Sequence, residues 1–77
     1  MIGEKLMYYD TKESGKRMKE ARIKKGYTQA ELSAIIGMGE NSIARIESGI
    51  RGTSIDSILL FAQALEESVD YLLTGKR

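Results

Sequence analysis

Residues 28–49 read TQAELSAIIGMGENSIARIESG, and this stretch decides the fold. Thr28, followed three residues later by Glu31, forms a T-x-x-E capping box, which predicts that a helix starts here. Gly37 suits a sharp turn that requires positive φ, and a second short helix is predicted beyond it, over residues 40–48. Two short helices around a glycine turn, within twenty-two residues, have the layout of a helix-turn-helix.

The spacing of apolar and small residues inside this stretch supports the same layout. The positions that two steeply crossing helices must bury are all apolar: Leu32, Ile36, Met38, Ile43 and Ile46. Ser33 provides the small side chain needed where the two helices approach most closely. All of these positions meet the requirements of a helix-turn-helix at once, which argues against a chance pattern.

Start signals also predict helices on both sides of this unit. Asp10 is a suitable N-cap for a helix over residues 11–25, which Gly26 ends. Ser54 caps a fourth helix, and Ser68 caps a short fifth one. The apolar repeat of the fourth helix consists of Ile55, Ile58, Leu59, Ala62 and Leu65. The expected fold class is therefore all-α, a compact bundle of five helices.

The helical pattern also predicts the domain organisation. Residues 11–75 form one domain, because 77 residues suffice for a single small core. Residues 1–10 are expected to form an N-terminal arm, for which disorder is the default, and residues 76–77 a basic C-terminal end. A chain of this size is not expected to hold a separate effector or sensor domain.

Composition argues against several classes of function. The chain has no cysteine and no histidine, so it lacks the usual thiolate and imidazole metal ligands and the commonest general base. It has no phosphate-binding loop, and its carboxylates do not follow a metal-ligand spacing. We therefore expect no metal, no cofactor and no enzymatic activity. The longest apolar run, residues 58–62, is far below the roughly 20 residues of a membrane span, so we expect a cytoplasmic protein without a membrane partner.

The net charge of +1 conceals an asymmetry along the chain. Residues 12–28 carry seven Lys or Arg against two Glu, whereas residues 52–75 carry four acidic residues and no Lys or Arg. A compact molecule with such ends could face phosphates with its positive side. A basic helix that is simply solvated explains the charges equally well, and composition alone does not separate the two.

The chain resembles the Cro and phage-repressor type of helix-turn-helix, also called the xenobiotic-response-element family. The resemblance covers residues 15–75 and rests on four segments: KRMKEAR at 16–22, GYTQAELS at 26–33, NSIARIESG at 41–49 and ALEESVDYLL at 64–73. It implies a lambda-repressor-like bundle of five helices. It also implies a transcriptional regulator, expected to be a repressor, that binds operator sequences in double-stranded DNA as a homodimer.

The resemblance implies roles for individual residues. Arg22 and Glu47 would form a buried ion pair between the first and third helices. The base-reading positions, on the helix from about Glu40 to Ser48, are Glu40, Asn41, Ala44 and Arg45. Phosphate contacts would come from Thr28, Gln29, Ser42, Arg51 and Thr53.

Side-chain chemistry suggests what each base-reading position would recognise. Arg45 suits guanine, Asn41 suits adenine or a phosphate, and Ala44 suits a thymine methyl group. Glu40 suits the amino group of cytosine, but a carboxylate also favours a helix N-terminus for its own sake. Gln29 could equally be an ordinary first-turn residue, whose backbone N–H would still offer a site for an anion. Both alternatives remain open at this point.

The chain departs from the family pattern in five places, of which Glu40, whose two interpretations are given above, is the most serious. Gly39 replaces the usual Ser or Thr cap of the third helix. Glu66 and Glu67 replace a glycine and an apolar residue, so the connection to the fifth helix is either reshaped or absent, with the two helices running on continuously. Leu60 replaces a polar residue and, with Tyr71, suggests an apolar surface for a dimer or another partner. The alternative function is therefore an antitoxin-like or bridging module whose main partner is another protein.

Overall fold

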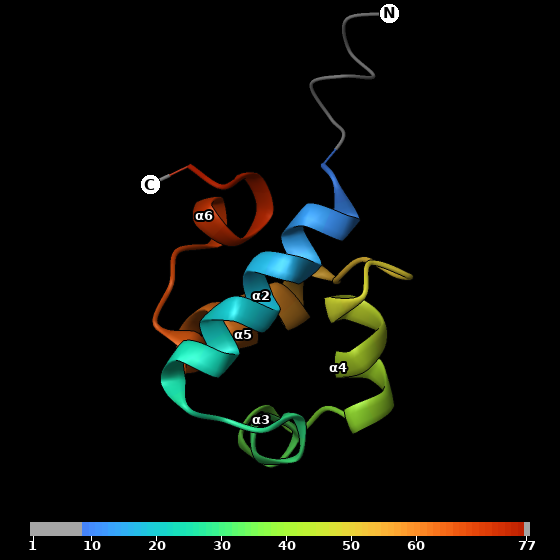
Figure 1. The fold of residues 1–77 in the computed structure, drawn as a ribbon, viewed down its shortest axis with the longest axis vertical. Coiled ribbons are helices and arrows are strands. Elements are labelled where there is room, and N and C mark those ends of the chain that lie inside the picture. Colours follow the sequence, from blue (N-terminus) through green and yellow to red (C-terminus); the bar gives the residue numbers. More distant parts are fainter. Residues whose placement is uncertain (1–8, 77) are drawn as a thin grey trace, which may run out of the picture.

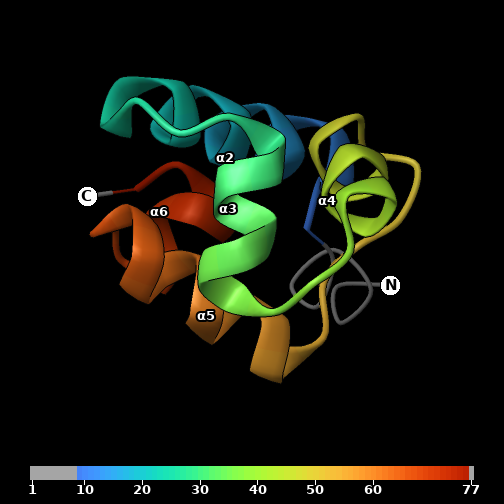
Figure 2. The same ribbon diagram turned by 90° about the horizontal axis from the view of Figure 1, so that it is seen from below.

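The computed structural model describes residues 9–76, and within this range the chain forms five α-helices and no strand. The helices are α2 (Thr11–Lys25), α3 (Gln29–Ile36), α4 (Glu40–Glu47), α5 (Ile55–Leu65) and α6 (Val69–Thr74). The long helix α2 lies across the molecule, with α5 behind it and α4 and α6 on opposite sides (Figure 1). Seen from below, α3 and α4 cross steeply (Figure 2). The all-α, five-helix prediction is confirmed.

Four of these helices start at the side-chain caps that the sequence predicts. Asp10 accepts from the backbone N–H groups of Lys12 and Glu13, and the capping box at Thr28 is complete in both directions. Ser54 and Ser68 each accept from the N–H three residues ahead. Satisfying N–H groups that would otherwise lack partners fixes where each helix begins.

Ten apolar side chains form one core between the helices. They are Met18, Ala21, Leu32, Ile36, Ile43, Ile46, Ile58, Phe61, Leu65 and Leu72. The helix-turn-helix positions predicted to be apolar and buried are in this core, apart from Met38, which is half-buried against it. Ser33 donates its hydroxyl to the carbonyl of Met38 and so closes the turn between α3 and α4.

Two residues of the apolar repeat predicted for α5 are exposed, as is Ile35, which follows the helical spacing of Leu32 and Ile36 on α3; a third residue of the α5 repeat, Ala62, packs against the core from outside. Ile35, Ile55 and Leu59 are 52%, 78% and 51% exposed. The helical repeat places them on the apolar side of α3 or α5, but these short helices contact their neighbours along a narrow stripe only. Periodicity gives the direction of the stripe and not its width.

The crossing of α2 and α4 depends on Gly15, whose importance the sequence analysis missed. A Cβ atom at this position would lie 2.2 Å from the carbonyl oxygen of Ile46 and 2.7 Å from that of Glu47. No side chain fits there, because the obstacles are backbone atoms. Gly15 therefore sets the distance between the two helices.

The opposite side of α2 holds α6. Ser14, which is fully buried, donates its hydroxyl to the Leu72 carbonyl at 2.7 Å. Arg17 donates to the same carbonyl at 3.2 Å and to that of Leu73 at 2.9 Å. These bonds satisfy carbonyl groups in the last turn of α6. A helix of six residues is thereby stabilised by its contacts with α2.

The connection between α5 and α6 is reshaped, and the alternative of one continuous helix is wrong. Glu66 adopts a left-handed conformation with φ of 56° and ends α5. It also forms an ion pair with Lys25 at the end of α2. The hydrogen bond from Lys25 lowers the pKa of Glu66, and the same bond raises the pKa of Lys25. This exposed pair stabilises the fold between these two pKa values, and its contribution fades as the pH falls through the Glu66 pKa or rises through the Lys25 pKa.

Glu66→Gly is expected to raise the midpoint of thermal unfolding by a few degrees. Glycine adopts positive φ without the steric cost that glutamate bears, and this gain should exceed the loss of a solvent-exposed ion pair. Circular dichroism melts at low and high salt measure the effect, which should be larger at high salt because the ion pair is then screened in the parent protein. A lower midpoint at both salt concentrations would show that the ion pair outweighs the backbone strain.

The predicted N-terminal arm lies mostly outside residues 9–76. Of the predicted N-terminal arm, residues 1–8 are outside the described range, while Asp10 caps α2 and Tyr9 contacts a loop described below. No helix in the described part of the chain is long and apolar enough to cross a membrane.

Candidate nucleic-acid interface

Helix α4 has a buried face and an outward polar face. Its inward side consists of Ile43, Ile46 and Glu47, all buried. The predicted base-reading residues lie on the other side: Glu40, Asn41 and Arg45 are exposed, and Ala44 is half-buried. An α-helix is about 10–12 Å across with its side chains, and the major groove of B-form DNA is wide enough to admit one.

The first turn of α4 lacks a side-chain cap. Gly39 occupies the N-cap position with extended backbone and makes no side-chain bond to the helix. Glu40 follows in the first turn, where the helix dipole favours a carboxylate. The geometry is compatible with both interpretations of Glu40, as a dipole partner and as a reader of cytosine.

A buried ion pair fixes the C-terminal end of α4 to α2. Arg22 Nε lies 2.7 Å from Glu47 Oε2, and Arg22 Nη2 lies 3.1 Å from Glu47 Oε1, which makes the contact bidentate. The two residues are only 8% and 6% exposed. Arg22 Nη1 also donates to the carbonyl of Tyr27 at 2.8 Å, which connects the pair to the start of α3. This is the pair that the family resemblance implies.

Two predicted phosphate-binding residues lie at the N-terminus of α3. Thr28 is exposed and its hydroxyl oxygen accepts from Glu31 N–H at 3.0 Å. Gln29 is half-buried and donates from Nε2 to Glu47 Oε1 at 3.0 Å. Gln29 thus braces α4 within the protein itself. Ser42, the predicted contact on α4, is half-buried.

The remaining predicted phosphate-binding residues lie in the loop after α4. Arg51 is exposed, and Thr53 is half-buried. The backbone N–H groups of Ile50 and Arg51 donate to the carbonyl of Arg45, at 3.0 and 3.4 Å. The loop is therefore folded back onto the end of the proposed reading helix.

The structure adds three residues to this region that the sequence analysis did not assign. Tyr9 Oη accepts from Thr53 N–H at 3.2 Å, and Thr11 Oγ1 donates to the carbonyl of Gly49 at 3.2 Å. Lys12 packs against Gly49, where an added Cβ would lie 2.7 Å from Lys12 Cγ. The basic run at 12–28 includes Lys12 and could have drawn attention to it. No sequence pattern connects Tyr9 with a loop more than forty residues away.

The two residues of the predicted partner surface lie on different helices. Leu60 is 39% exposed and lines a shallow hollow on α5 together with Asp56, Leu59 and Gln63. Tyr71 on α6 is half-buried and does not line this hollow. The hollow therefore belongs to α5, while other exposed apolar side chains lie on α2 (Ile23), on α3 (Ile35) and in the loop after α4 (Ile50).

The model of one protein family, described as helix-turn-helix, matches residues 18–72. The chain belongs to this helix-turn-helix family. The match spans most of the described helices, including the whole of α3, the turn and α4. The resemblance inferred from the sequence is confirmed.

Named regulators are among the relatives of this helix-turn-helix chain. The HTH-type transcriptional regulator ImmR of Bacillus subtilis is 41% identical over 59 residues, which cover 77% of this chain and 46% of ImmR. The chain spans less than half the length of the curated relatives it matches.

Two solved structures match the fold over nearly their whole length. The P22 c2 repressor, determined in complex with a synthetic operator, has a TM-score of 0.79 and 30% identity, covering 82% of this chain and 96% of that one. The restriction-modification controller protein C.AhdI from Aeromonas hydrophila has a TM-score of 0.78 and 32% identity, covering 86% and 100%. The lambda-repressor-like fold is thereby confirmed.

Proposed function

We propose that this helix-turn-helix domain is a sequence-specific DNA-binding repressor that reads an operator with α4. The observation that carries the proposal is the outward polar face of α4, with phosphate donors at the start of α3 and in the loop after α4. Base edges give sequence preference, and the donors on either side fix the position of the helix in the groove. The relatives named as transcriptional regulators and the operator complex of the P22 c2 repressor support it.

The fixed position of α4 is central to this function. The Arg22–Glu47 pair and the bond from Gln29 to Glu47 hold the buried end of the helix from two sides. Base readout by hydrogen bonds requires side chains placed within a narrow range of distances and angles. A reading helix that is already held in place loses less conformational entropy on binding DNA.

Binding to the DNA upstream of the protein's own gene tests this proposal. Fluorescence anisotropy with that duplex and with a scrambled duplex, each over a salt series, measures affinity and specificity together. Tight binding to the native duplex alone, with a log–log salt slope of about −5 to −10, would support an operator reader with several phosphate contacts. Weak and equal binding to both duplexes would instead favour the antitoxin-like or bridging role.

Arg45→Ala and Gln29→Ala are expected to act differently on DNA binding. Arg45→Ala should weaken operator binding by about 1–3 kcal/mol and flatten the preference at one base pair, because it removes a base contact. Gln29→Ala should weaken binding to every duplex, because it removes a phosphate contact, and should weaken operator binding somewhat more, because it also removes the bond to Glu47 that holds α4. Anisotropy titrations with operator, single-base variants and scrambled DNA measure both effects. Equal losses on operator and scrambled DNA for Arg45→Ala would remove it from the base-reading set.

We further propose that the domain acts as a homodimer through the exposed apolar face of α5. Leu59 and Leu60 line its hollow, and Ile55, 78% exposed, lies one turn before them. Two copies joined there would present two α4 helices to half-sites one helical turn apart, about 34 Å. A palindromic operator would then match the symmetry of the protein.

Leu60→Glu is expected to shift the protein from dimer to monomer, because it buries a charge in an apolar interface. Sedimentation equilibrium measures the change, and affinity for a palindromic operator should fall with it. Ile23→Glu provides a matched control, since Ile23 is 57% exposed on α2 and outside the proposed interface. A parent protein that is monomeric at every accessible concentration and on DNA would contradict the dimer.

A further inference from the structure

We propose that Tyr9 is a positioning residue for DNA binding, which holds the loop after α4 in the conformation that brings Arg51 and Thr53 to the phosphate backbone. The inference rests on the proposed function and concerns a residue that precedes the first described helix. It follows from the contacts between the start of α2 and residues 48–54.

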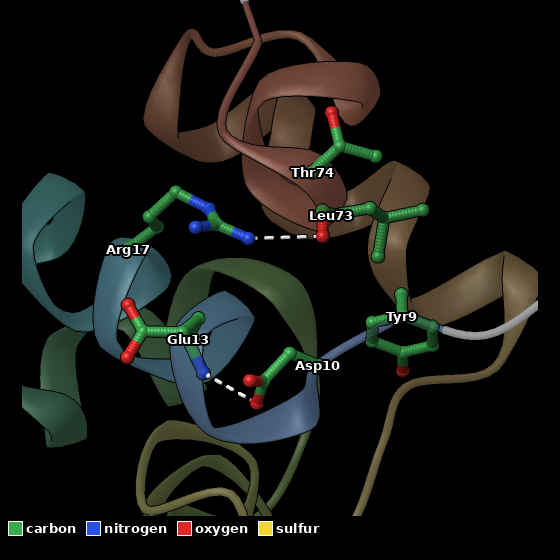
Figure 3. A pocket seen from close by; sticks show the side chains of 6 residues that line it. All are labelled: Tyr9, Asp10, Glu13, Arg17, Leu73 and Thr74. Atoms are coloured by element: carbon green, nitrogen blue, oxygen red, sulfur yellow. Dashed lines mark hydrogen bonds between the residues drawn. The ribbon is translucent and has the colours of Figure 1, made fainter. Parts of the chain in front are cut away.

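Tyr9 contacts the loop in two ways. Its hydroxyl oxygen accepts from Thr53 N–H at 3.2 Å, although the two residues are 44 positions apart in the sequence. The hydroxyl also lies so close to Gly52 that a Cβ there would be 2.5 Å from Tyr9 Oη. Figure 3 shows the ring beside the first turn of α2, with the hydroxyl turned away from Leu73. The other side of the residue lines a pocket with Arg17 and Leu73.

The rest of the loop is held at its beginning and is attached to the reading helix. Thr11 Oγ1 donates to the Gly49 carbonyl at 3.2 Å, and the N–H groups of Ile50 and Arg51 donate to the Arg45 carbonyl. These bonds fix the loop as far as Arg51. Between Arg51 and the Ser54 cap, the described part of the chain makes one hydrogen bond, from Thr53 N–H to Tyr9 Oη.

Through these contacts, Tyr9 affects the part of the loop that carries the two proposed phosphate-binding residues. Arg51 and Thr53 lie on either side of Gly52, whose backbone packs against the tyrosine hydroxyl. A loop held before the DNA arrives loses less conformational entropy on binding. Because phosphate contacts carry no sequence information, weakening this loop should reduce affinity for all duplexes alike.

Tyr9→Phe tests the proposal because it keeps the ring and removes the acceptor. The variant should bind both the operator and the scrambled duplex about threefold to tenfold more weakly, as expected for loss of one hydrogen bond. Its log–log salt slope should be shallower by up to about 1, because one phosphate contact is weakened. Hydrogen exchange at Thr53 N–H should become several-fold faster in the free protein, with an almost unchanged midpoint of thermal unfolding.

An Arg51→Ala background separates positioning from a general effect on stability. If Tyr9 acts through the loop's phosphate contact, Tyr9→Phe should have little further effect once Arg51 is gone. Thr74→Val, which removes a hydroxyl that donates to the Asp70 carbonyl on α6, should leave the affinity and salt slope unchanged. Unchanged binding by Tyr9→Phe, or full additivity with Arg51→Ala, overturns the inference while the parent protein still binds DNA. Failure of the parent protein to bind any duplex would instead overturn the proposed function.

Discussion

Arg22→Ala is expected to lower the free energy of unfolding by about 3–5 kcal/mol, because it leaves the Glu47 carboxylate buried without its charged partner. Glu47 is 6% exposed, so water cannot replace the two lost hydrogen bonds, and Gln29 offers only one donor. The carbonyl of Tyr27 loses its partner as well. A domain of this length has a total stability of only about 4–12 kcal/mol, so the substitution removes at least about a quarter of it, and at the low end of this range it unfolds the domain at 25 °C.

Urea denaturation followed by circular dichroism measures this loss, and a double variant provides the control. Arg22→Met combined with Glu47→Leu removes both charges and should be clearly more stable than Arg22→Ala, because no charge is left buried alone. The double variant should nevertheless bind operator DNA more weakly, since apolar contacts fix the angle of α4 less strictly than a bidentate pair does. A loss below about 1 kcal/mol for Arg22→Ala would show that water reaches the pair.

Gly15→Ala is expected to destabilise the domain strongly, although it adds only one methyl group. The added Cβ would lie 2.2 Å from the Ile46 carbonyl oxygen and 2.7 Å from that of Glu47, so α4 must move away from α2. The cost should be at the upper end of the about 1–3 kcal/mol typical of overpacked cores, even though alanine favours the helix by up to about 1 kcal/mol. Displacement of α4 should also reduce operator affinity more than the loss of stability explains.

Gly26→Ala is the matched control for this effect. An added Cβ at Gly26 meets no atom within 4 Å, but the residue has φ of +85°. The substitution should therefore cost about 1–2 kcal/mol through backbone conformation alone, and the folded fraction should bind DNA normally. Thermal melts and anisotropy titrations of both variants separate the two mechanisms. Equal operator affinity for the folded fractions of the two variants would contradict a role for Gly15 in placing α4.

Local patterns in the sequence account for most of the fold. The caps at Asp10, Thr28, Ser54 and Ser68 predict four helix starts, because capping depends on residues only two or three positions apart. Helical periodicity predicts most of the buried residues for the same reason. The family resemblance, in turn, supplied the Arg22–Glu47 pair, whose members are 25 positions apart.

Contacts between distant segments could not be predicted in this way. Gly15 looks like an unfavourable residue within a helix until the carbonyl groups of α4 are seen beside it. Arg17 contributes to the basic run, yet its side chain is used to hold the end of α6. Tyr9 lies in a stretch without periodicity, and only the folded chain brings it to Thr53. In each case the partner is more than thirty residues away and leaves no local signal.

The measurement that tests the central claim most directly is a map of backbone amide shifts by nuclear magnetic resonance, during titration with the duplex that the protein binds. If α4 reads the bases, the largest shifts should fall on residues 40–45, at the start of α3 around Gln29, and in the loop around Arg51. With a scrambled duplex, the shift changes of residues 40–45 should be much smaller, while the amides at the phosphate-binding positions should still shift. Shifts concentrated on α5 and α6, with α4 unaffected by either duplex, would contradict the account.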